Sequence, residues 1–190
     1  MKVILASASP RRKELLKRLY NEFEIIPADI DETLPDDIGI EFAPMFLAAT
    51  KADFIAANYP NDLIIAADTV VICDGNLYGK PKDEAEAKTM LTSLSGKTHK
   101  VITGCCISIG ENTTCFSEES YVTFFKLKNK EIDEYIASGE AMGKAGAYAI
   151  QGLGALLVEK IDGDYNNIVG LPIARLKREI EDLLQHNNKE

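Results

Sequence analysis

Residues 2–16 read KVILASASPRRKELL, and this run joins an apolar strand pattern to the start of a helix. Val3 to Ala6 are apolar without interruption, which is typical of a strand buried on both faces. Ser9 is a favourable N-cap residue and Pro10 suits the first helical position, so a helix is expected to begin here. A strand that leads through a short loop into a helix is typical of α/β proteins.

The loop of this unit also has the composition of a phosphate site. Backbone N–H groups at a helix start point toward one spot, where hydroxyl and guanidinium groups can join them. The side chains concerned are Ser7, Ser9, Arg11 and Arg12. The same residues would also suit a capped surface helix with solvated arginines, and so short a motif does not choose between the two.

Outward from this unit, helix and strand patterns alternate along the chain, with hairpin turns among them. Periodicity predicts further helices at 42–58, 83–94, 128–138 and 172–185. Strands are expected at 23–26, 63–67, 70–73, 100–109, 114–125 and 156–161. This order predicts an α/β fold with a mixed, twisted sheet flanked by helices, and the tail from residue 186 to 190 is expected to fray. At this length one domain or two closely packed lobes would both fit, and because no linker is visible residues 1–190 are expected to form a single domain.

Asp68 is the second candidate functional residue, because it follows the apolar run 63–67 and is expected to end that strand. In open α/β sheets, functional groups collect beyond the carboxyl ends of the strands. A carboxylate there could orient a metal ion or take a proton from an attacking water. An aspartate that merely satisfies turn donors is the alternative.

Two lysines and a glutamate complete the candidate set. Lys51 interrupts an otherwise apolar helix pattern, and Lys80 precedes Pro81 in a turn that can project its ammonium group. With the two arginines they would supply four positive charges to a triphosphate. Glu32 could hold a divalent cation, since Mg²⁺ prefers one or two carboxylates plus substrate phosphates. Taken alone, each of these three residues is better explained as a solvated surface residue than as part of a site.

The overall composition excludes several classes of protein. The 190 residues are 46 % apolar and 27 % charged, as in ordinary globular proteins. The formal net charge of −9 would repel extended nucleic acid, whereas a small phosphorylated ligand needs only a few converging cations. No apolar run approaches the length of a membrane span, and no signal-peptide pattern opens the chain, so a cytoplasmic protein with no membrane partner is expected.

Cysteine and histidine usage argues against two further kinds of chemistry. The cysteines form no C-x-x-C pair, so structural zinc is not expected. They are expected to be small buried residues in a protein of a reducing compartment. They are Cys73, Cys105, Cys106 and Cys115. His99 is expected to be a strand residue with a local hydrogen bond, because no Gly-x-Ser-x-Gly elbow accompanies it.

Taken in chain order, these segments resemble the Maf family from end to end. The matching blocks are 3–12, 31–32, 51–52, 67–71, 79–81, 94–96, 144–152 and 169–172. The resemblance implies a fold like that of the inosine triphosphatases, with two lobes around a central cleft, and a homodimer. Ala141 and Gly143 stand where the family often has proline and aspartate, which predicts a more mobile loop before Tyr148.

The resemblance also implies a reaction, in which a nucleoside triphosphate is hydrolysed to the monophosphate and pyrophosphate with Mg²⁺ or Mn²⁺. Asp68 becomes the proton acceptor and, with Glu32, a metal ligand. The phosphate-facing group becomes Ser7, Ser9, Arg11, Arg12, Lys51 and Lys80.

Within the family, Arg12, Thr69 and Gln151 resemble the branch that prefers dTTP and UTP, with modified pyrimidine nucleotides as further candidates. A glutamine amide offers the donor and acceptor that the edge of uracil or thymine needs. Two other readings stay open: a nucleotide-binding regulator of septum formation with little turnover, and a phosphatase that removes the terminal phosphate.

Overall fold

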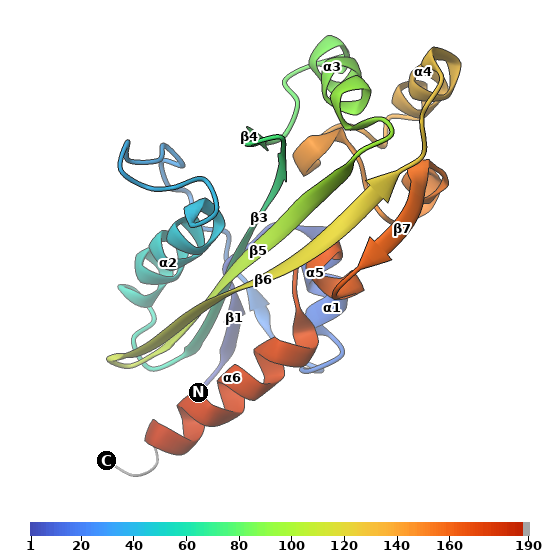
Figure 1. The fold of residues 1–190 in the computed structure, drawn as a ribbon. Coiled ribbons are helices and arrows are strands. Elements are labelled where there is room, and N and C mark those ends of the chain that lie inside the picture. Colours follow the sequence, from blue (N-terminus) through green and yellow to red (C-terminus); the bar gives the residue numbers. More distant parts are fainter. Residues whose placement is uncertain (188–190) are drawn as a thin grey trace. The chain divides into compact units, whose positions relative to one another are not determined.

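The structure is a computed structural model that describes residues 1–187, with side chains as far as Gln185. In this part of the chain one sheet has the strand order β2-β1-β3-β5-β6-β7, with β4 pairing with β3 (Figure 1). The strands are β1 (Val3–Leu5), β2 (Glu24–Ile25), β3 (Leu63–Cys73), β4 (Asn76–Tyr78), β5 (Thr98–Ile109), β6 (Asn112–Phe124) and β7 (Val158–Asp162). β1 runs parallel to β2 and β3, whereas the pairs β3–β4 and β6–β7 are antiparallel. The predicted mixed sheet of an α/β fold is therefore confirmed.

The chain divides into two compact units, in agreement with the two lobes that the resemblance implies. The first contains Met1–Asp68, Thr103–Glu118 and the described residues from Gly170 onward. The second contains Thr69–Ile102 and Glu119–Val169. The strands β3, β5 and β6 contribute residues to both units.

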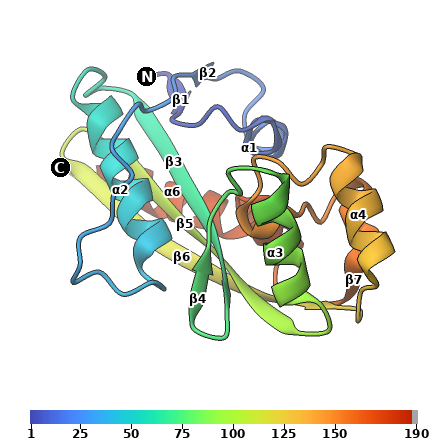
Figure 2. The same cartoon turned by 90° about the horizontal axis from the view of Figure 1, so that it is seen from above.

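The first unit has helices on both faces of its strands. Its helices are α1 (Pro10–Leu16), α2 (Ala43–Ala56) and α6 (Ile173–Asn187). α2 lies so close to β5 that a Cβ on Gly104 would be 2.2 Å from the backbone nitrogen of Met45, so only glycine fits there. On the opposite face the guanidinium of Arg175, from α6, lies 4.8 Å from the ring centre of Phe116 in β6. Figure 2 shows α2 in front of these strands and α6 behind them.

The second unit packs its helices over a core of its own. α3 (Glu84–Leu94) and α4 (Asn129–Ala137) contact each other, and both supply apolar side chains to this core. Two short 3-10 helices follow, η1 (Ala145–Ala147) and η2 (Gly152–Leu157). Ala141 is buried in this core, and Gly143 has a φ of +70°, a conformation that glycine adopts readily.

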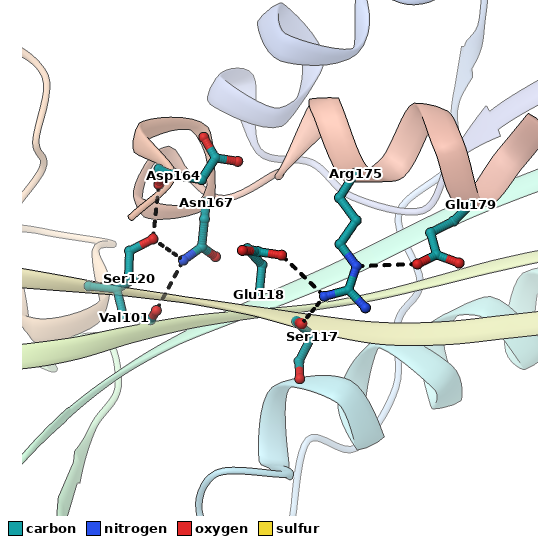
Figure 3. A network of polar contacts seen from close by, with 8 residues as sticks. All are labelled: Val101, Ser117, Glu118, Ser120, Asp164, Asn167, Arg175 and Glu179. Atoms are coloured by element: carbon teal, nitrogen blue, oxygen red, sulfur yellow. Dashed lines mark hydrogen bonds and ion pairs between the residues drawn. The ribbon is translucent and has the colours of Figure 1, made fainter. Parts of the chain in front are cut away.

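A buried polar network also lies in the second unit, around a short helix that the sequence did not predict, α5 (Tyr165–Val169) (Figure 3). Asn167 is fully buried, and its amide donates to the carbonyl of Val101 at 3.1 Å and to the hydroxyl of Ser120 at 2.8 Å. The Ser120 hydroxyl in turn donates to the carbonyl of Asp164 at 3.0 Å. These bonds fix α5 to two strands, because a buried amide is costly to leave unsatisfied.

Helix starts and turns agree with the sequence. The Ser9 hydroxyl accepts from the backbone N–H of Arg12 at 3.4 Å, and Pro10 occupies the first turn of α1. One of the expected hairpin turns joins β3 to β4 through Asp74 and Gly75, both at positive φ.

Three expectations need correction. β3 does not end at Asp68 but runs through it to Cys73, because the ammonium of Lys51 compensates its carboxylate. Cys106 and Cys115 form a disulfide, because the short turn between β5 and β6 places them opposite each other; Cys73 and Cys105 are buried free thiols, as predicted. The last helix continues to Asn187, beyond the expected fraying point, and residues 188–190 lie outside the described chain.

Candidate functional site

The loop after β1 is organised around the hydroxyl of Ser7, a residue that is 9 % exposed. This oxygen accepts from the backbone N–H of Ser9 at 3.3 Å and from the Arg12 guanidinium at 3.1 Å. A hydroxyl has two acceptor lone pairs and one proton, so both lone pairs are engaged and the O–H remains able to donate. Such a fixed donor suits an anionic oxygen.

Arg12 is held from two sides. Its Nε donates to the carbonyl of Gly170 at 2.8 Å, in addition to the bond from Nη1 to Ser7. Desolvation lowers the pKa of its guanidinium, while the negative charges of Asp68 and Glu32 act in the opposite direction. Arginine stays protonated even so. The first turn of α1 therefore carries a fixed positive charge, and Arg11 lies partly buried beside it in sequence.

Lys51 joins the two predicted carboxylates. Its Nζ lies 2.7 Å from an oxygen of Asp68 and 2.7 Å from an oxygen of Glu32. The Lys51 side chain is only 10 % exposed and that of Asp68 16 %, whereas Glu32 comes from an open loop and is half exposed. These three side chains, the Lys51 cluster, come from α2, β3 and the loop between β2 and α2.

The local packing explains why this lysine is buried. Ala48, Ala52 and Ile55 of α2 pack into the core of the first unit, and Gly104 brings the helix close to the sheet. Lys51 lies in the same helix, directly before Ala52. Its stem therefore lies along apolar surface and its ammonium reaches β3. An unpaired buried ammonium would be strongly destabilising, and the two carboxylates prevent this.

The carboxylates of the Lys51 cluster fit a divalent cation. They already converge on one positive centre, as the ligands of a metal ion do. In residues 1–187 no group of three or more acidic, histidine or cysteine side chains is suited to a metal. Two carboxylates are compatible with Mg²⁺, which takes few protein ligands and completes its shell with water and substrate phosphate oxygens. Glu32 and Asp68 are therefore the residues that would hold it.

The remaining predicted residues belong to the second unit. Thr69 follows Asp68 in β3 and is partly buried. Lys80 is exposed between Gly79 and the buried Pro81, and the Gly79 carbonyl accepts from the N–H of Gly146 at 3.1 Å. Gln151 is exposed immediately before η2. Hydrogen bonding thus joins the turn that carries Lys80 to the loop that precedes Gln151.

Two further contributors were missed by the sequence analysis. The Gly170 carbonyl that holds Arg12 is a backbone group, and no side-chain pattern marks it. Glu140 accepts from the N–H groups of Leu153 at 2.9 Å and Gly154 at 3.3 Å, and so fixes the start of η2 beside Gln151. An acidic residue placed before a glycine-rich segment was the available signal for it.

His99 is part of the interior of the second unit. It is buried, and its Nε2 lies 2.8 Å from the hydroxyl of Tyr148, so the predicted hydrogen bond exists but its partner is 49 residues away. Burial lowers the pKa of His99 to about 4. Phe124 and Tyr148 pack edge-on against the ring. The residue is thus a neutral core histidine at ordinary pH.

The fold and site together define an α/β protein in which acidic and basic side chains of the first unit form a compact cluster. The chain belongs to the Maf family: the sequence model of the family described as Maf-like protein matches residues 2–183. The predicted family is therefore confirmed. Among the helices of residues 1–187, none is both long and apolar enough to span a membrane.

Curated relatives are similar over almost the whole chain. A protein of Bacillus mycoides (strain KBAB4) named dTTP/UTP pyrophosphatase is 50 % identical over 185 residues, which cover 95 % of this chain and 94 % of that protein. A protein of Bacillus cytotoxicus with the same name is 49 % identical, with the same coverage. Among solved structures, the Staphylococcus aureus Ham1 protein is 14 % identical with a TM-score of 0.47, over 65 % of this chain and 72 % of that one.

Proposed function

We propose that this protein is a nucleoside triphosphate pyrophosphatase that hydrolyses dTTP and UTP to the monophosphate and pyrophosphate. The Lys51 cluster is the observation that supports this most directly, because in one unit it places the ammonium of Lys51 2.7 Å from the carboxylate of Asp68 and 2.7 Å from that of Glu32. Relatives 50 % and 49 % identical over 95 % of the chain carry the name of this activity.

In this proposal Asp68 takes the proton from a water molecule whose oxygen attacks the α phosphorus. The new P–O bond forms as the bond from the α phosphorus to the bridging oxygen breaks, and pyrophosphate leaves with that oxygen. Lys51, Lys80, Arg11 and Arg12 neutralise the charge that builds on the leaving group, while Ser7 and Ser9 orient the phosphates. Positioning and electrostatic stabilisation supply most of the rate in such transfers.

Glu32 and Asp68 would hold Mg²⁺ or Mn²⁺, which when bound supplies positive charge at the phosphate oxygens. Arg12, Thr69 and Gln151 are the proposed determinants of pyrimidine preference. Glu140 supports Gln151 in that role, because it fixes the backbone that follows the amide.

We also infer that both units act as one catalytic domain, since the family match of residues 2–183 includes both of them. The proposed assembly is a homodimer in the cytoplasm. Light scattering of the purified protein measures the assembly directly.

Product analysis tests the reaction. The protein is incubated with a panel of natural and modified nucleoside triphosphates and with Mg²⁺ or Mn²⁺, and the products are separated by ion-exchange chromatography. Monophosphate and pyrophosphate in equal amounts, over many turnovers and fastest with dTTP and UTP, are expected. Diphosphate and inorganic phosphate would identify a terminal phosphatase instead, and saturable binding without product would identify a nucleotide-binding regulator.

A further inference from the structure

We propose that Lys51 holds the cation position between Glu32 and Asp68 until substrate arrives, so that the protein takes up a divalent cation only together with the triphosphate. The substrate is then the metal–nucleotide complex. This inference rests on the proposed function, because it concerns the same carboxylates and the same phosphate chain.

The contact geometry gives the first reason. Lys51 Nζ is 2.7 Å from both carboxylates, which is the distance of a strong charge-assisted hydrogen bond. A cation that binds these two oxygens at metal–ligand distances must displace the ammonium from between them. The 10 % exposure of the Lys51 side chain gives that ammonium little access to water, so displacement without a new partner is costly.

The charge balance gives the second reason. Glu32 and Asp68 contribute two negative charges, and Lys51 contributes one positive charge in direct contact with them. Arg12 contributes another, since the charges of both acids act on its guanidinium. The four groups sum to zero. These four groups therefore offer no excess negative charge to a divalent cation that enters alone.

A triphosphate removes both obstacles. Its oxygens offer the displaced Lys51 ammonium a new anionic partner, and they supply several of the ligands that Mg²⁺ or Mn²⁺ requires. Its negative charge also offsets the two charges that the metal brings. Lys51 then moves from the carboxylates to the phosphates, and in this way one residue both excludes free metal and binds the substrate.

Direct measurement of Mn²⁺ binding tests this inference without any reaction. Free Mn²⁺ is followed by electron paramagnetic resonance during titration of the wild-type protein, Lys51→Met and Lys17→Met, all without nucleotide. Lys17 is the matched control, since it lies in the same unit and pairs with Glu14 at 2.6 Å on an exposed surface. Lys51→Met is expected to bind Mn²⁺ about tenfold or more tightly than the other two, because one repelling charge is gone from the site.

Two additional arms make the result decisive. Glu32→Gln added to Lys51→Met is expected to abolish the gain, and an α,β-methylene analogue of UTP is expected to raise wild-type Mn²⁺ affinity about tenfold or more after the Mn²⁺ bound by the analogue alone is subtracted, since its phosphates complete the metal's shell. Wild-type protein that binds Mn²⁺ as tightly without the analogue as with it would overturn the proposal, whether or not Lys51→Met folds. So would a folded Lys51→Met that gains no affinity.

The outcome is separable from that of the proposed function. Pyrophosphate release by a protein that binds Mn²⁺ tightly without nucleotide would reject only the role of Lys51 in excluding free metal. Analogue-dependent Mn²⁺ binding without pyrophosphate release would reject only the catalytic proposal.

Discussion

Lys51 in the first unit and His99 in the second are both buried polar residues, with 8 % and 1 % of the whole residue exposed, but their surroundings differ in kind. Lys51 contacts two carboxylates, and the guanidinium of Arg12 experiences the charge of the same two acids. His99 contacts the hydroxyl of Tyr148 and two aromatic rings, and burial keeps it neutral. The groups around Lys51 are charged, whereas the groups that contact His99 are neutral.

This difference teaches where to look for function in the molecule. A buried cluster of charges is usually no more stable than a well-packed apolar one, so its presence needs another reason. Neutral hydrogen-bonded groups such as Asn167 and Ser120 are sufficient to define a unique core. We therefore expect substitutions in the Lys51 cluster to affect turnover more than folding. Substitutions among the neutral buried groups of the second unit are expected to affect folding more than turnover.

Asp68→Asn is expected to have the largest effect. The amide keeps the shape of the side chain but cannot accept the proton from water, so turnover is expected to fall about a thousandfold, within the range typical for loss of a general base. The free energy of unfolding is expected to change far less than the activation free energy of the reaction. Pyrophosphate release at saturating dTTP, together with urea unfolding, measures both.

Asp53→Asn is the matched control, because Asp53 is an exposed aspartate of α2 in the same unit. It is expected to leave both quantities near the wild-type values. If Asp68→Asn kept more than about a third of wild-type turnover, far above the loss typical for a general base, Asp68 would not be the proton acceptor.

The pH dependence of stability provides a second test, at His99. Its folded pKa of about 4 lies below the value of about 6.5 in an unfolded chain. Between these values the unfolded state binds more protons, so stability is lost as the pH falls from about 6.5 toward about 4, by about 3 kcal/mol for this group alone. Urea unfolding at several pH values measures the slope.

Replacing both partners sharpens this test. His99→Phe combined with Tyr148→Phe removes the titrating group and leaves no hydroxyl without its partner, so the slope is expected to decrease at little cost at neutral pH. Tyr148→Phe alone keeps the buried histidine and is expected to keep the slope. An unchanged slope in the double variant would show that other groups cause the acid sensitivity.

Asn167→Ala is expected to have a smaller effect, on stability alone. The substitution removes the hydrogen bond that Asn167 donates to the Val101 carbonyl and shortens a buried side chain, at a cost of about 2 kcal/mol. For a chain of this size that corresponds to a fall in Tm of roughly 4–8 °C. Asn166→Ala, one residue earlier and less buried, controls for the helix itself. A large loss of turnover in folded Asn167→Ala would contradict the separation of the two regions.

The sequence predicted those parts of the molecule that depend on local chemistry. The cap at Ser9, the turn at Asp74 and the mixed sheet follow from residue types and periodicity, which act over a few residues. The Lys51 cluster does not, because its members come from three elements and meet only after α2 packs against the sheet. The prediction that a strand ends at Asp68 was wrong, because the ammonium that compensates this carboxylate comes from Lys51 in α2. Neither the Gly170 carbonyl nor α5 had a local pattern to mark it.

Lys88→Met is expected to have the smallest effect and completes the comparison. Lys88 Nζ lies 2.6 Å from Asp133, as close as Lys51 lies to Asp68, but the two side chains are 49 % and 55 % exposed. Water already solvates both charges, so the loss of this pair is expected to change the free energy of unfolding by less than about 1 kcal/mol.

Lys51→Met is expected to cost about 2 kcal/mol or more, because the Asp68 carboxylate has far less access to water. Urea unfolding of both variants compares two ion pairs of nearly equal length that differ in burial. Equal costs would mean that burial does not distinguish the Lys51 cluster, and the functional interpretation of that cluster would then have to stand on turnover alone.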